Sequence, residues 1–370
     1  MQRFRVLYTG DYLNEAGQPL PGIGLDLLDG VPHIEVGFLT DQSPKESDTT
    51  YWDRLYSFEI TPEHVSAANG LVVCRPWVKA SAFMKGAENL LAIGRAGAGY
   101  DKIDVSACTR HDVLVFNCPD TLTHSTASAA LLLLLALAKR LPQQERLARS
   151  GRWDRQADVM GDDLTGQTLG IIGLGNTGLE LARLIAPFGM NVIAFSPRAE
   201  PSRAQSLGIR LTATLDELLQ NSDFVSLHCR LEEKNRGMIG ESELKLMKPT
   251  SYLINVARGE LIKQEILVRC LRERWIAGAG LDVFETEPIT ADDPLLSLDN
   301  VILTPHWLPS TYQAARATLS SIADGMIRIA TGELPRNILN PEVLEKPSFQ
   351  AKLIRLAVAS NGKPGQLWGA

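Results

Sequence analysis

The sequence predicts an α/β protein of two domains, each built on a parallel β-sheet. Three observations support this prediction. The chain has 370 residues, which is more than one ordinary core organises and suits two domains. Short apolar segments alternate with helical segments over most of its length, a pattern typical of parallel sheets with helical crossovers. A GxGxxG sequence, Gly173 to Gly178, directly follows an apolar strand and opens a regular, doubly wound arrangement.

The first 120 residues predict the smaller α/β domain. Its five expected strands are short apolar segments: FRVLY, IEVGF, GLVVC, LLAIGR and DVLVFN. The segment TPEHVSAAN predicts a helix with Thr61 as its N-cap. An apolar run from Ala129 to Ala138 has about half the length that spans a bilayer and is followed by Lys139 and Arg140. We therefore expect this run to form a buried helix.

From Thr168 the alternation becomes longer and more regular. Six strands are expected, in the segments TLGIIG, NVIAF, DFVSLH, SYLINV, AGAGLD and NVILTP. A helix of about residues 311–331 follows the last of them. In two-domain proteins of this order such a helix often crosses back to the first domain, so we expect the C-terminal segment to complete that domain. Residues 351–370 include a Gly- and Pro-containing stretch and are expected to form a flexible tail.

Composition disfavours several kinds of partner. The formal net charge is −6 and the pI is about 5.6, whereas a nucleic acid or an anionic membrane requires a basic face. The N-terminal segment MQRFRVLYTGDYL lacks the apolar region of a secretory signal. No metal is expected, because His33, His64 and His111 show no paired ligand spacing. The cysteines are expected to be reduced thiols in a cytoplasmic protein, since they follow no CxxC spacing: Cys74, Cys108, Cys118, Cys229 and Cys270.

The GLGNTG turn predicts a dinucleotide site. Gly173, Gly175 and Gly178 allow a tight turn, close approach of a pyrophosphate to the backbone and close helix packing. About twenty residues later, where such a chain usually has an acid that holds the adenosine ribose, this one has Ser196 and Arg198. Serine can donate to a 2′-phosphate and arginine can pair with it, which favours NADP over NAD. The alternative is that Arg198 is an ordinary solvated arginine.

Three further segments follow strand ends, where open α/β sheets bind their ligands. They are NVARGELI with Arg258, LDVFETEP with Asp282 and Glu287, and LTPHWLPST with His306. A histidine paired with a carboxylate can give its proton to a carbonyl oxygen as hydride reaches the carbon. The pattern suggests His306 as acid/base and Glu287 as its partner. Arg258 is suited to hold a substrate carboxylate and to polarise the adjacent carbonyl of a 2-oxo acid.

The stretches GRAGAGYDKID, GLGNTG, NVARGELI, GLDVFETEP, LTPHWLPST and NILNPEVL, in this order, resemble the D-isomer-specific 2-hydroxyacid dehydrogenases. This family includes D-3-phosphoglycerate, glyoxylate/hydroxypyruvate and D-lactate enzymes. The resemblance implies an NAD(P)-dependent oxidoreductase that acts on a small 2-oxo or D-2-hydroxy acid. It also implies a Rossmann domain, residues 121–317, inserted in a smaller flavodoxin-like substrate domain formed by residues 1–120 and 318–350. Catalysis would occur in the cleft between them.

The resemblance implies further site residues. The backbone at Ala98 and Gly99 would receive the substrate carboxylate, with Arg75 nearby. The cofactor site would include two residues at the pyrophosphate and four along its lining: Asn176 and Thr177, and then Cys229, Val256, Ala257 and Asp282. His124 and Thr126 would face the interdomain cleft. In the family, the helix that corresponds to residues 125–141 contributes to a two-fold dimer, which predicts a homodimer.

Several departures from the family pattern stand out. Ser128 replaces a common glutamate, and Trp307 follows the histidine where a smaller residue is frequent, so its ring would narrow the pocket. Arg230 adds positive charge that would favour a 2′-phosphate. Two alternatives stay open. One is a nucleotide-sensing binding protein similar to the C-terminal-binding corepressors, and the other is a formate or phosphite dehydrogenase of the same fold.

Overall fold

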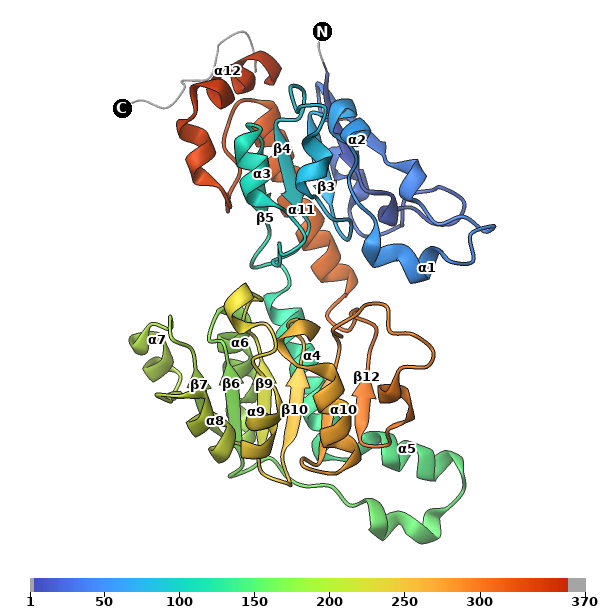
Figure 1. Cartoon of the computed structure of the whole chain (residues 1–370), viewed down its shortest axis with the longest axis vertical. Helices are drawn as coiled ribbons and strands as arrows, with labels where there is room; N and C mark the ends of the chain where they lie inside the picture. The colour runs from blue at the N-terminus through green and yellow to red at the C-terminus, as the bar shows by residue number, and fades with distance from the viewer. Residues whose placement is uncertain (1–2, 359–370) are drawn as a thin grey trace. The chain divides into compact units, whose positions relative to one another are not determined.

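The structure, a computed structural model, describes residues 3–358. The chain divides into two compact units. One unit is formed by the chain through residue 122 together with the chain from residue 311 onward, and the other by residues 123–310 (Figure 1). The middle of the chain is therefore inserted between the two parts that form the first unit.

The first unit contains a five-stranded parallel sheet with the order β2-β1-β3-β4-β5. Its strands coincide with the five predicted segments: β1 (Phe4–Tyr8), β2 (Ile34–Phe38), β3 (Gly70–Val73), β4 (Ala92–Arg95) and β5 (Leu114–Asn117). Runs of apolar residues bounded by turns made these strands predictable. The order is that of flavodoxin, which confirms the predicted fold class of this unit.

In the part of the first unit that the structure describes there are five α-helices: α1 (Tyr51–Arg54), α2 (Pro62–Ala67), α3 (Val105–Arg110), α11 (Tyr312–Ala330) and α12 (Pro347–Leu356). The predicted cap of α2 is present, because Thr61 Oγ1 accepts from the backbone N–H of His64 at 3.4 Å. His64 is buried. Its ring accepts from the backbone N–H of Thr61 and meets Asp41, so it completes the cap.

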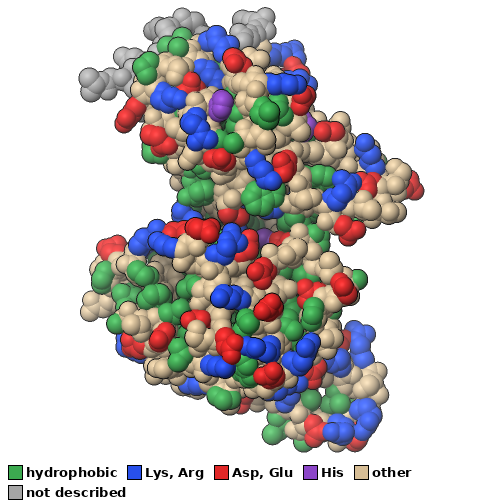
Figure 2. All heavy atoms as spheres, viewed as in Figure 1, with side chains coloured by type: hydrophobic (Ala, Val, Ile, Leu, Met, Phe, Trp, Pro, Cys, Tyr) green, Lys and Arg blue, Asp and Glu red, His purple; other side chains and the backbone are tan. Residues whose placement is uncertain are grey.

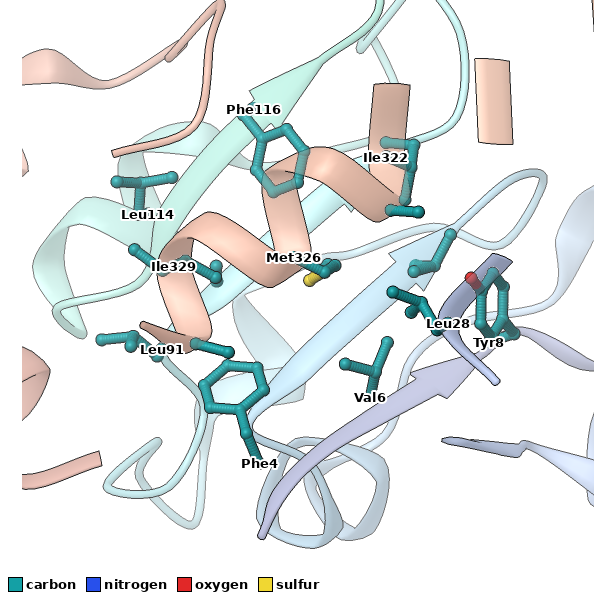
Figure 3. Packing of buried hydrophobic residues seen from close by; sticks show 14 of the residues in the cluster. Phe4, Val6, Tyr8, Leu28, Leu91, Leu114, Phe116, Ile322, Met326 and Ile329 are labelled. Carbon is teal, nitrogen blue, oxygen red and sulfur yellow. The ribbon is translucent and has the colours of Figure 1, made fainter. Parts of the chain in front are cut away.

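Helix α11 packs on the first sheet, and the hydrophobic core of this unit lies between them. Figure 3 shows Met326 and Ile329 among apolar side chains of the strands. The contact is close because glycine lacks a side chain: a Cβ at Gly70 would lie 2.7 Å from Met326 Sδ, and one at Gly325 would lie 2.3 Å from Phe116 Cε2. This packing explains why the C-terminal segment folds with the N-terminal one.

Three boundaries differ from those expected. The first part of the first unit ends at residue 122 rather than 120. The second part of the first unit begins at residue 311 rather than 318, because Thr311 caps an uninterrupted helix through its bond from Ala314 N at 3.1 Å. Residues 351–356, expected in a flexible tail, belong to α12. Phe349 and Leu353 of this helix are buried in the same core as β1. The rest of the expected tail, from residue 359, lies outside the described residues.

The second unit contains a seven-stranded parallel sheet with the order β12-β11-β10-β9-β6-β7-β8. Its strands are β6 (Thr168–Ile172), β7 (Asn191–Phe195), β8 (Arg210–Leu211), β9 (Phe224–Leu227), β10 (Tyr252–Asn255), β11 (Gly278–Leu281) and β12 (Val301–Leu303). The order reverses between β6 and β9, as in the predicted Rossmann fold. Six strands were predicted; β8 was missed because its two residues form no apolar run.

The helices of the second unit are α4 (Thr123–Ala138), α5 (Leu141–Arg149), α6 (Asn176–Ile185), α7 (Pro201–Ser206), α8 (Leu215–Asn221), α9 (Glu241–Leu246) and α10 (Gln264–Arg272). The apolar run lies in α4, which packs against β10, β11 and α6. Within residues 3–358, no single helix has the length and apolar character to cross a membrane. Only α4 and α5 taken together pass that test, and they are bent by 60°.

Candidate active site

The GLGNTG turn connects β6 to α6. Gly173 has φ of +95°, and a Cβ there would lie 2.5 Å from the backbone nitrogen of Cys229. A Cβ at Gly178 would lie 2.4 Å from the Gly173 carbonyl oxygen, so the missing side chain lets α6 begin against the strand. Gly173 and Gly178 therefore have the structural roles expected of a dinucleotide turn.

Gly175 differs from the other two glycines. A Cβ added there would meet no described atom within 4 Å, so its backbone faces open space. Asn176 and Thr177 begin α6 directly after it, with their N–H groups at the positive end of the helix. An open backbone cradle at a helix N-terminus fits the pyrophosphate of a nicotinamide dinucleotide. These residues are therefore suited to hold the pyrophosphate of the cofactor.

The adenosine end differs from the expectation in one respect. Ser196 and Arg198 follow β7 as predicted, but the Arg198 guanidinium is paired with the Glu232 carboxylate, which lies after β9. Lys234 Nζ binds the same carboxylate at 2.8 Å. Hydrogen bonds from Lys234 and Arg198 lower the pKa of Glu232 to about 2. An acid is thus present at this end, from a loop that sequence reasoning did not connect with it.

Cys229, Val256 and Ala257 follow β9 and β10. Cys229 packs beside Gly173, and burial raises the pKa of its thiol to about 11, so it is a neutral packing group near neutral pH. Val256 is buried, and the backbone N–H of Ala257 donates to Asn255 Oδ1 at 3.0 Å. Cys229 thus lies beside the glycine turn, whereas Val256 and Ala257 follow the end of β10, two strands away from β6.

His306 and Glu287 form the predicted pair. His306 Nδ1 lies 2.7 Å from Glu287 Oε2, and the other carboxylate oxygen accepts from the backbone N–H of Phe284 at 3.1 Å. Burial acts to raise the pKa of Glu287. The hydrogen bond and charge of His306, with the nearby charge of Arg258, outweigh it and hold this pKa below its usual value. Glu287 therefore remains a carboxylate that orients the imidazole.

Asp282 fixes the segment that carries His306. Its buried Oδ1 accepts from Thr304 Oγ1 at 2.6 Å and from the backbone N–H groups of Trp307 and Leu308 at 3.2 and 3.1 Å. Burial raises the pKa of Asp282 despite these bonds. His306 itself has φ of +52°, a strained conformation for a residue with a side chain. The hydrogen bonds of Asp282 to residues before and after His306 hold the backbone in this strained conformation.

Arg258 follows β10 on a tight turn. Asn255, buried at the end of this strand, donates through Nδ2 to the Arg258 carbonyl at 2.8 Å, and Arg258 Nη1 donates to the Ala257 carbonyl at 2.7 Å. A Cβ at Gly259 would lie 1.9 Å from the Phe284 carbonyl carbon, so glycine lets this turn touch the loop that leads to Glu287. Sequence reasoning assigned no role to Asn255 and Gly259, although both belong to the segment NVARGELI.

The remaining predicted residues lie at the carboxyl edge of the first unit's sheet. Arg75 follows β3, and both its backbone N–H and its Nη1 donate to Asp11 Oδ2 at 3.2 Å. Ala98 and Gly99 follow β4, and Asn117 Nδ2 donates to the Ala98 carbonyl at 2.7 Å. Sequence reasoning missed Asp11, a buried carboxylate whose partner is 64 residues away.

Comparisons with known proteins identify the family of this chain. Residues 131–307 match the model of the D-isomer specific 2-hydroxyacid dehydrogenase, NAD binding domain. A glyoxylate reductase of Korarchaeum cryptofilum is 36% identical over 337 residues, which cover 90% of this chain and 97% of that protein. The chain belongs to the D-isomer specific 2-hydroxyacid dehydrogenase family. It is therefore an NAD(P)-dependent oxidoreductase that interconverts 2-oxo and 2-hydroxy acids.

Other members of this dehydrogenase family match over different lengths. A D-3-phosphoglycerate dehydrogenase of Methanocaldococcus jannaschii is 42% identical over 254 residues, 69% of this chain and 48% of that one. The crystal structure of an NADPH-dependent glyoxylate/hydroxypyruvate reductase from Sinorhizobium meliloti superposes with a TM-score of 0.72 and 28% identity. That match covers 91% of this chain and 98% of the other.

Other residues that the sequence analysis considered in this dehydrogenase contact side chains or carbonyls of the second unit. His124 Nδ1 meets Glu180 Oε1 at 2.7 Å, Ser128 Oγ donates to the Ser125 carbonyl, and buried His228 meets Ser226 Oγ at 2.8 Å. Thr126 lies half-buried in α4. All five cysteines are free thiols. Among residues 3–358, no group of three or more His, Cys, Asp or Glu side chains is placed to hold a metal ion.

Proposed function

We propose that this dehydrogenase reduces a small 2-oxo acid similar to glyoxylate or hydroxypyruvate to the D-2-hydroxy acid. The pairing of His306 with Glu287 carries the proposal, since it places an oriented imidazole at the edge where β10, β11 and β12 end. Arg258 follows a strand end on the same edge, and relatives described as glyoxylate reductases support this substrate class.

His306 is the proton donor in this proposal. Glu287 binds Nδ1, so the opposite ring nitrogen, Nε2, is the atom that carries the proton for the carbonyl oxygen. A nicotinamide nucleotide, when bound, supplies the hydride that the carbonyl carbon accepts. As that oxygen gains negative charge, His306 donates its proton, and Glu287 stabilises the cationic imidazole beforehand.

The substrate carboxylate is assigned to Arg258 in the proposal. Arg258 offers a planar fork of N–H donors that matches a carboxylate and can polarise the adjacent carbonyl. Within the first unit, the backbone N–H groups at Ala98 and Gly99 and the side chain of Arg75 keep the substrate-binding role that the family resemblance implies. The left-handed φ of +134° at Gly97 turns the chain just before these two residues, which supports this assignment.

NADP is the favoured cofactor in this proposal. Ser196 stands where an acid would repel a 2′-phosphate, and Arg198 and Arg230 bring positive charge to the same end. The Sinorhizobium meliloti relative is described as NADPH-dependent, which agrees with this choice. Catalytic turnover with NADPH exceeding that with NADH is the expected outcome.

The assembly proposed is a cytoplasmic homodimer without nucleic-acid or membrane partners. Leu132 of α4 and Leu141 of α5 are about half exposed, and Trp153 and Met160 in the following segment are more exposed still. A second copy would cover these apolar side chains. Figure 2 shows basic and acidic side chains interspersed over the viewed face, which favours no polyanion as partner. Free thiols agree with a reducing compartment.

The test is the initial rate of nicotinamide oxidation by the purified chain with glyoxylate, hydroxypyruvate and pyruvate, each with NADPH and with NADH. Turnover of glyoxylate or hydroxypyruvate with a lower KM for NADPH supports the proposal. Turnover only with NADH would overturn the cofactor choice alone. Tight nucleotide binding without turnover of any of the three 2-oxo acids would overturn the assigned roles. It would favour a nucleotide sensor if formate and phosphite, tested with NAD+ and NADP+, also failed to react.

A further inference from the structure

The adenosine end of the cofactor site holds three charged side chains from two loops. Arg198 follows β7, whereas Glu232 and Lys234 belong to the loop between β9 and α9. The carboxylate of Glu232 accepts from Arg198 and lies 2.8 Å from Lys234 Nζ. Both cations of this cluster, Arg198 and Lys234, are therefore already bound to an acid of the chain.

Glu232 is the fixed member of this cluster. Its backbone N–H donates to Asn235 Oδ1 at 2.7 Å, and its side chain accepts from the backbone of Asn235 in a capping box. Only 25% of the Glu232 side chain is exposed, against 75% for Arg198 and 73% for Lys234. The cations reach toward an anchored carboxylate, so an arriving phosphate must compete with it.

This cluster affects the two nucleotides in opposite senses. A 2′-phosphate carries nearly two negative charges, which a fixed carboxylate repels at the same time as it occupies the cations. The 2′-hydroxyl of NADH carries no charge and can donate to a carboxylate, as in chains that have an acid after the second strand. The low pKa of Glu232, about 2, keeps it ionised throughout the neutral range.

We propose that Glu232 is a specificity-determining residue that weakens NADPH relative to NADH by competing with the 2′-phosphate for Arg198 and Lys234. The inference rests on the nucleotide site of the proposed function, but it applies whichever nucleotide the enzyme prefers. Glu232 limits the preference for NADPH over NADH that Ser196 and Arg198 create.

The test is the dissociation constant of NADPH and of NADH, measured by fluorescence titration on the full chain without substrate. Glu232→Gln removes the charge and keeps an oxygen for the capping bond. We expect NADPH to bind about three- to tenfold more tightly and NADH to bind equally or less well. The gain should shrink at high salt, because the cluster is largely exposed.

Glu233→Gln is the matched control. Glu233 is the next residue, its side chain is 92% exposed, and it lies 3.8 Å from Arg236 rather than against Arg198. The Glu233→Gln substitution removes the same charge as Glu232→Gln, so a general effect of net charge on nucleotide binding would appear in both variants. An Arg198→Gln background should reduce the effect of Glu232→Gln.

An unchanged ratio of the two dissociation constants, or an equal change in Glu233→Gln, would overturn the inference. Weaker NADPH binding in Glu232→Gln would also overturn it and would make Glu232 a support for the cations. A wild-type preference for NADH contradicts only the proposed cofactor choice. The direction of the mutational shift decides the role of Glu232 separately.

Discussion

At the scale of single residues, the site depends on carboxylates that orient other groups. Glu287 uses one oxygen for His306 and the other for a backbone N–H, so the imidazole has one fixed orientation. Asp282 accepts three hydrogen bonds from the segment around that histidine. A proton donor must be held within about 0.5 Å of its productive position, and these bonds supply that precision.

His306→Ala tests the proton donor. We expect kcat to fall by about 10²- to 10⁴-fold, because no other oriented acid replaces the imidazole. The dissociation constant of the nucleotide should change little, since the glycine turn is unaffected. Stopped-flow turnover and nucleotide titration on the same preparation measure both effects. Unchanged turnover would remove His306 from the mechanism.

Arg258→Lys tests the anchor of the substrate carboxylate. A lysine keeps the charge but offers a point donor in place of a planar fork. We expect kcat/KM to fall by about 10- to 100-fold, which is the cost of one lost charge-assisted hydrogen bond. Steady-state kinetics over a range of glyoxylate concentrations measures this. A variant with wild-type kcat/KM would show that another group holds the carboxylate.

At the scale of elements, the strand ends and the turns that follow them place the site. Parallel strands end at one edge, so residues more than a hundred positions apart, such as Gly173 and His306, lie at the same edge of one sheet. Glycines then bring the turns into contact, as Gly259 does beside Phe284. The role of each glycine in the cofactor turn is separable by mutation.

Gly178→Ala and Gly175→Ala form a matched pair. A methyl group at Gly178 would collide with the Gly173 carbonyl, so we expect a loss of stability of about 1–3 kcal/mol. A methyl group at Gly175 meets no described atom and its φ is −85°, so the unfolding midpoint should be retained. Nucleotide affinity should still fall about tenfold or more, because the methyl group blocks the backbone cradle. Equal behaviour of the two variants in thermal unfolding would contradict this division of roles.

At the scale of the whole molecule, local patterns predicted most of the fold. Apolar runs predicted eleven of the twelve strands found within residues 3–358, and β8 was missed because it has two residues. The cofactor turn and the His306–Glu287 pair were predictable because their motifs are continuous in sequence. Glu232 and Asp11 were not, since each meets its partner only through tertiary folding, 34 and 64 residues apart.

The joining of the chain's two ends in the first unit also depends on tertiary contacts. Lys352 of α12 is buried and donates to the carbonyls of His111 and Asp112, at 3.3 and 2.8 Å, just beyond α3. Burial lowers the pKa of Lys352 to about 8, only partly opposed by the charge of Asp112. Burying the protonated lysine therefore raises the free energy of the folded state but not that of the unfolded chain.

This cost gives stability a distinct dependence on pH. The folded pKa lies below the unfolded value of about 10.4, so between about pH 8 and 10.4 the unfolded chain binds more protons and stability rises with pH. The full gain from this residue is on the order of 3 kcal/mol. Buried thiols act in the opposite sense, because burial raises the pKa of Cys270 to about 11 and that of Cys108 to about 12.

Lys352→Met isolates the lysine from those thiols, which are common to both proteins. We expect the difference in unfolding free energy between wild type and variant to move in favour of wild type as pH rises from 8 to 10. The methionine retains much of the apolar stem but neither the charge nor the hydrogen bonds to the carbonyls of His111 and Asp112. Urea unfolding of both proteins at pH 7, 8, 9 and 10, followed by circular dichroism, measures this difference. A difference that stays constant over this range would mean that Lys352 titrates as an exposed lysine and that its burial costs the fold nothing.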